Sequence, residues 1–121
     1  MKNKEYMSIK KMKDYANKAL KYTKDCDFEE FSNNEEKVDA TVFAISQIGE
    51  LVKNISKETM DRYSSIEWII IKNLRNKIVH DYEGINLSLI WDIIENDIEK
   101  LKEDLDKILS ESESDNDEEG Q

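Results

Sequence analysis

The scarcity of turn residues is the feature that most limits the fold of this chain. Its 121 residues include three glycines and no proline. A β-sandwich or an α/β protein needs turn residues about every ten positions, and long stretches of this sequence have none. The sequence therefore predicts an all-α domain, in which a few long helices are joined by short polar loops.

Apolar residues recur every three or four positions in four stretches of the chain, which is the spacing of one face of a helix. The stretches cover residues 5–24, 35–55, 66–79 and 87–109. The last helix is expected to begin at Asn86 or Leu87. The pattern predicts that residues 1–109 form one domain, a four-helix up-down bundle.

Two polar segments interrupt the periodic pattern and are expected to be connections. Residues 25–34 join the first two helices, and residues 57–64 join the second to the third. Phe28 and Phe31 can fill a gap in the core from the first connection. Asn34 is a suitable N-cap for the second helix, because an acidic first turn follows it.

The third helix contains the most apolar run in the chain. Ile69-Ile70-Ile71 has strand propensity, but the apolar pattern continues to Val79, which is long for a strand. The helix is expected to begin after Ser64 or Ser65 and to end at Gly84. Because it is apolar on more than one face, one face is expected to contact a second subunit.

The net charge of −10 is unevenly distributed. Eight lysines and two acids give residues 1–24 a charge of +6, whereas residues 25–109 carry −10. Residues 110–121 contain six acids, no base and no apolar side chain, so a disordered acidic tail is expected there. This balance argues against a broad, non-specific nucleic-acid binder, but it does not exclude a small basic site near the lysine-rich first helix.

The composition also limits the class of protein. No apolar run approaches the roughly 20 residues that cross a bilayer, and no secretory signal is visible. Cys26 is the only cysteine, so neither an intramolecular disulfide nor a cysteine-based zinc site is expected. We therefore expect a cytoplasmic protein with no metal and no cofactor.

One cluster of residues is suited to chemistry. The chain has two arginines and one histidine, and Arg75 and His80 stand within six residues of each other, with Asn76 and Tyr82 beside them. Histidine transfers protons near neutral pH, and arginine binds phosphate through its planar fork. Asn76 and His80 are one helical turn apart, whereas Arg75 and His80 are about 140° apart around the axis.

A purely structural explanation of this cluster is also open. His80 could cap the end of the helix or lie on the surface without a role in catalysis. Arg75 could simply pair with Glu67 or Asp81.

The same residues carry a resemblance to a known family. The string Arg75-x4-His80-x-Tyr82 resembles the signature of the HepT-like branch of the HEPN family. The similarity covers roughly residues 5–109, and it extends to Trp68, Trp91, Asp39-Ala40 and Ile48-Gly49-Glu50. The proline that often precedes the motif tryptophan is absent.

The resemblance implies a metal-independent RNA endonuclease, acting as the toxin of a toxin–antitoxin pair with a minimal nucleotidyltransferase as antitoxin. It further implies a homodimer in which Arg75 and His80 are catalytic, and silencing by the addition of AMP to Tyr82. Asn76 would support the site by orienting His80 or holding a phosphate oxygen. Since RNA cleavage needs both a general base and a general acid, the single His80 gives a chemical reason for two chains.

Two other functions stay open at this point. The chain could be a non-catalytic binding module that docks a nucleotidyltransferase or binds nucleotide. It could also be a four-helix protein with a purely structural use.

Overall fold

The computed structural model describes the backbone of residues 1–80 and 86–119 and the side chains of residues 1–76 and 86–112. Within these residues the chain is helical and contains no strand, so the predicted all-α class is confirmed. The long helices are α1 (Asn3–Thr23), α3 (Glu35–Leu51), α5 (Trp68–His80) and a continuous helix made of α6 (Leu87–Ile93), η3 (Ile94–Ile98) and α7 (Glu99–Glu119).

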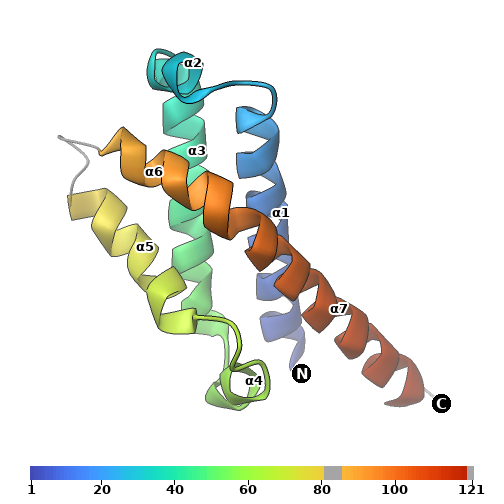
Figure 1. The fold of residues 1–121 in the computed structure, drawn as a ribbon. Helices are drawn as coiled ribbons and strands as arrows, with labels where there is room; N and C mark the ends of the chain where they lie inside the picture. Colours follow the sequence, from blue (N-terminus) through green and yellow to red (C-terminus); the bar gives the residue numbers. More distant parts are fainter. Residues whose placement is uncertain (81–85, 120–121) are drawn as a thin grey trace.

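These helices form a bundle around one core. Figure 1 shows α1 and α3 side by side and antiparallel, with α5 beyond α3 and the α6–η3–α7 helix crossing over α3 and α1. The most deeply buried side chains come from α1, α2, α3, η3 and α7 together: Ile9, Met12, Phe31, Ile45, Ile48, Ile98, Leu105 and Ile108. The stretch 66–79 adds the buried side chains of Ile66, Trp68 and Ile71, so all four predicted apolar stretches contribute to this core.

Both segments that were predicted as connections contain a short helix. These are α2 (Phe28–Ser32) and α4 (Lys57–Arg62), and a 3-10 turn, η1 (Val52–Asn54), precedes the second. Asp27 caps α2 by accepting a 2.8 Å hydrogen bond from the backbone N–H of Glu30. Phe31 is fully buried, as predicted, although it fills the core from a helix rather than from a loop. The same prediction is wrong for Phe28, which is 38% exposed.

The helix α4 is fixed to α1 by a buried carboxylate. Glu5 is 6% exposed, and its Oε1 accepts hydrogen bonds from the Ser56 backbone N–H at 2.7 Å and the Ser56 hydroxyl at 2.9 Å. The Ser56 hydroxyl in turn accepts from the backbone N–H of Thr59, which makes it the N-cap of α4. Glu5 therefore connects the start of the chain to the corner that leads into α5.

The helix α5 begins at Trp68, a few residues later than the sequence pattern predicted. Ser64 and Ser65 lie in the preceding turn and are not its N-cap. The Tyr63 carbonyl accepts hydrogen bonds from the backbone N–H of Ile66 and from the Trp68 indole N–H, both at 3.1 Å. These two hydrogen bonds to one carbonyl oxygen stabilise the turn that precedes α5.

The last helix is longer than predicted. Its start agrees with the sequence, because Asn86 caps α6 by accepting from the backbone N–H of Leu89 at 3.2 Å. The predicted end at Leu109 is wrong, since α7 continues to Glu119. Glu111 accepts a hydrogen bond from the Tyr63 hydroxyl, and Ser112 is buried, so the first turn of the predicted acidic tail packs on the domain.

Among the described residues, no helix combines the length and the apolar character that crossing a membrane would need.

Candidate active site

The motif helix α5 lies unusually close to α3, and Gly49 is the reason. A Cβ atom at Gly49 would lie 2.9 Å from the carbonyl oxygen of Ile71 and 3.2 Å from the backbone nitrogen of Arg75. No side chain fits between the two backbones at this point. Gly49 therefore permits close packing of α5 on α3, and this packing brings Arg75 directly over α3.

Arg75 forms an ion pair with the residue that follows Gly49. Its Nη1 lies 3.2 Å from Oε2 of Glu50, and the arginine side chain is 52% exposed. Sequence reasoning offered Glu67 or Asp81 as partners. The described pair is with Glu50 instead, while Asp81 lies outside the described residues.

Glu50 contacts two cations at once. The Lys53 ammonium donates a hydrogen bond to Oε1, and this bond, together with the charges of Arg75 and Lys53, lowers the pKa of the Glu50 carboxyl below its ordinary value of 4.5. The carboxylate is therefore ionised at neutral pH. Because a guanidinium has five N–H donors, this pair leaves donors of Arg75 for a phosphate group.

The other motif residues are placed by the backbone of α5. Asn76 is exposed, and the helix remains regular to His80, which lies one turn beyond Asn76. Because the helix is not loosened before His80, Arg75 and His80 stay about 140° apart around its axis. The side chain of His80 and the whole of Tyr82 and Gly84 lie outside the described residues.

An exposed apolar residue leads into the polar part of α5. Ile69 is 75% exposed, and Asn73 and Asn76 follow it at intervals of four and three residues. Residues with this spacing share one face of a helix. Ile69 therefore lies on the same face of α5 as Asn76, and the described residues leave most of its side chain exposed.

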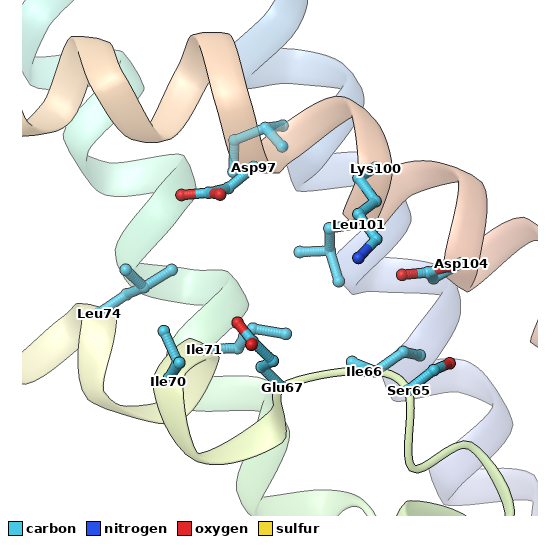
Figure 2. A pocket seen from close by; sticks show the side chains of 11 residues that line it. Ser65, Ile66, Glu67, Ile70, Ile71, Leu74, Asp97, Lys100, Leu101 and Asp104 are labelled. Carbon is cyan, nitrogen blue, oxygen red and sulfur yellow. The ribbon is translucent and has the colours of Figure 1, made fainter.

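A small cavity lies elsewhere, between the start of α5 and the last helix (Figure 2). Its volume is about 120 Å³, and its walls combine apolar side chains such as Ile70 and Leu101 with the carboxylates of Glu67 and Asp97. Burial, followed by the charges of Asp92 and Glu67, raises the pKa of Asp97. Neither Arg75 nor Asn76 lines this cavity, so it is separate from the motif.

In residues 1–76 and 86–112, no group of three His, Cys, Asp or Glu side chains could hold a metal ion.

Sequence reasoning assigned no role to Glu50. The ion pair joins residues of two different helices that are 25 positions apart in sequence, so no helical spacing reveals it. The available signal is the glycine beside Glu50, because a buried helical glycine often marks a close backbone approach.

The fold and the motif together define an α-helical domain of the HEPN type, with an exposed arginine and asparagine on its third long helix. This chain belongs to the HepT-like family: the family model described as "Ribonuclease HepT-like" matches residues 12–108. The resemblance drawn from the motif is therefore confirmed.

Relatives with similar sequences support the same family. "Putative RNase MJ0127" of Methanocaldococcus jannaschii is 33% identical over 113 residues, which cover 90% of each chain. "Putative RNase TTE0752" of Caldanaerobacter subterraneus is 33% identical over 74% of this chain and 80% of its own. "Probable ribonuclease HepT" of Thermococcus cleftensis is 29% identical over 72% of this chain and 79% of its own. No solved structure is significantly similar.

Proposed function

We propose that this chain is a metal-independent endoribonuclease that acts as the toxin of a toxin–antitoxin pair. The observation that carries the proposal is the placement of Arg75, which is held over Gly49 by Glu50 and remains half exposed, inside a chain of the Ribonuclease HepT-like family. The names of the relatives, which refer to RNases, support the same reaction class.

In the proposed reaction, the 2′-hydroxyl of RNA attacks the adjacent phosphorus and the 5′-oxygen leaves. One His80 removes the proton from the 2′-hydroxyl, and a second His80, protonated, donates a proton to the leaving oxygen. Arg75 stabilises the extra negative charge of the phosphorane between these two steps. Glu50 keeps the guanidinium in place and occupies only some of its N–H donors. Asn76 orients His80 or holds a phosphate oxygen.

This reaction needs two chains, because each supplies one histidine. We propose a homodimer in which the motifs of both chains face one cleft. The exposed Ile69 supports this arrangement, since it lies on the same face of α5 as Asn76 and would be buried by a second copy.

The proposed antitoxin is a minimal nucleotidyltransferase that adds AMP to Tyr82. Tyr82 is two residues beyond His80, so AMP at this position would bring bulk and negative charge next to the site. A bound AMP group would repel the phosphates of RNA and so prevent substrate binding.

The test is expression of the chain alone in a bacterial host, with growth and RNA integrity as readouts. We expect Arg75→Ala and His80→Ala each to relieve growth arrest and to abolish RNA cleavage by the purified protein in EDTA. Arg62→Ala is the matched control, because Arg62 is the other arginine and lies on α4, away from the motif. If both motif variants remain as toxic as the parent, the assignment is wrong.

Co-expression with a minimal nucleotidyltransferase tests the regulation separately. We expect the mass of the chain to increase by one or more AMP units, and Tyr82→Phe to prevent the increase. A chain that is neither modified nor able to cleave RNA would favour the non-catalytic docking module.

A further inference from the structure

The aromatic side chain with the greatest exposure among the described residues is Phe43. It is 56% exposed, and it lies on α3, two helical turns before Glu50. A half-exposed phenylalanine ring offers a flat apolar surface on which another ring can stack. The proposed reaction gives Phe43 no role.

Phe43 is part of an aromatic pair between α3 and α1. Its ring meets the ring of Tyr15 edge-on, with the centroids 6.1 Å apart and the planes at 80°. The ammonium of Lys18 lies 5.3 Å from the centroid of the Tyr15 ring. The two helices run side by side at this level (Figure 1), so the pair links their surfaces.

Positive charge flanks the aromatic pair on α1. Lys11 and Lys18 are four residues before and three residues after Tyr15, so all three share one flank of the helix. Both lysines are exposed. We call the four side chains Phe43, Tyr15, Lys11 and Lys18 the aromatic–lysine platform.

Three of the four platform residues, Lys11, Tyr15 and Lys18, lie in the strongly basic first part of an acidic chain. Residues 1–24 carry a net +6, although the chain as a whole carries −10. Exposed carboxylates lie nearby, since Asp14 precedes Tyr15 and Asp39 is one turn before Phe43. An anionic ligand would therefore follow the lysine side of the platform rather than the amino-terminal end of α3.

The platform is continuous with the candidate active site. Phe43 and Glu50 are seven residues apart on α3, so they share a face and are separated by about 10 Å along the axis. Glu50 contacts Arg75. A flexible polyanion bound at Arg75 would therefore pass next to Phe43 if it continued along α3.

We propose that the aromatic–lysine platform binds single-stranded RNA next to the cleavage site, with a base stacked on Phe43 and phosphates on Lys11 and Lys18. Interleaved aromatic and basic side chains are the general means of holding single strands, because every base has a face that stacks and every phosphate a charge. Lysine flanks fit a protein partner less well, since lysine is depleted from protein–protein contacts. The proposal rests on the ribonuclease function for the identity of the ligand.

Binding is best measured without cleavage, as the fluorescence anisotropy of a single-stranded RNA oligonucleotide in which every 2′-hydroxyl is methylated. We expect Phe43→Ala to raise Kd by roughly 5- to 150-fold, the range for loss of one stacked base. Phe43→Trp should bind about as well as the parent, because indole also stacks. An unchanged Kd for Phe43→Ala would overturn the proposal.

Two neighbouring lysines provide a matched pair of variants. Lys10 and Lys11 are both exposed, but they lie about 100° apart around α1, and only Lys11 is on the flank of Tyr15. Lys11→Gln should reduce the slope of log Kd against log salt by about 0.7, the value for one phosphate contact on a single strand. Lys10→Gln, with the same change in charge, should leave the slope near that of the parent. Equal effects of both variants would contradict a localised platform.

Two further measurements, of oligomeric mass and of RNA cleavage, separate this proposal from others. A change in the oligomeric mass of Phe43→Ala would overturn it, because it would show that a second copy covers Phe43. If the parent binds the oligonucleotide but purified protein cleaves no RNA, the ribonuclease proposal fails while the platform stands. If the parent cleaves RNA and Phe43→Ala leaves Kd unchanged, only the platform fails.

Discussion

Replacement of Gly49 by alanine tests the central contact of the candidate site. The added Cβ would lie 2.9 Å from the Ile71 carbonyl oxygen, whereas ordinary contact begins at 3.4 Å. The neighbour is a backbone atom, which cannot rotate away as a side chain would. The helix α5 must therefore move by about half an ångström relative to α3.

Two opposing effects set the size of the change in stability. Alanine favours helix over glycine by about 1 kcal/mol, which would stabilise α3. Overpacking a tight contact costs about 1–3 kcal/mol, and contact with rigid backbone favours the upper part of that range. We expect the free energy of unfolding of Gly49→Ala to fall by about 1–2 kcal/mol, because the packing cost exceeds the propensity gain.

Urea unfolding followed by circular dichroism measures this difference, and Ser46→Ala on the same helix is the control, since it adds no atom. A displaced α5 also moves Arg75, so the proposed RNA cleavage should lose roughly tenfold in kcat/KM. A Gly49→Ala protein that is more stable than the parent by about 1 kcal/mol would refute the reasoning, because helix propensity alone would then account for the result.

Two other predictions concern carboxylates. Glu5→Ala should lower the free energy of unfolding by about 1.5–3 kcal/mol, the range for hydrogen bonds to a charged group, because Ser56 loses its acceptor. Urea unfolding measures this change. An unchanged midpoint would contradict the role of Glu5. The native pKa of Asp97 is raised, so Asp97 disfavours folding increasingly as pH rises through and above its ordinary value of 3.8. Asp97→Asn should accordingly raise the free energy of unfolding at neutral pH, and this gain in stability should disappear below pH 3.8. A gain in stability that is constant between pH 3 and pH 7 would show that charge is not the cause.

The sequence alone predicted those parts of the fold that depend on local pattern. Helical spacing of apolar residues placed the long helices, including the start of the last helix at Asn86 or Leu87. The predicted N-cap Asn34 accepts its hydrogen bond from the backbone N–H of Lys37. The burial of Phe31 was also predicted, whereas Phe28 in the same segment is 38% exposed. These features need only residues that are close in the chain.

The rest depends on contacts between distant residues. The helix α4 is too short to show a period, and it is held by Glu5, 51 residues away from Ser56. The extension of α7 beyond Leu109 is acidic and lacks apolar residues, yet Tyr63 binds Glu111 and so fixes its first turn. Local composition describes neither contact, so it predicted a connection and a tail instead.

The candidate site shows the same division between local and distant information. The motif identified Arg75 and His80, but only the tertiary structure reveals that Arg75 is drawn toward α3 by Glu50. With α5 regular to His80, the two residues lie about 140° apart around the helix axis. Positions this far apart around one helix do not share a face. The separation supports the proposed homodimer, in which Arg75 of one chain and His80 of the other would act on the same phosphate.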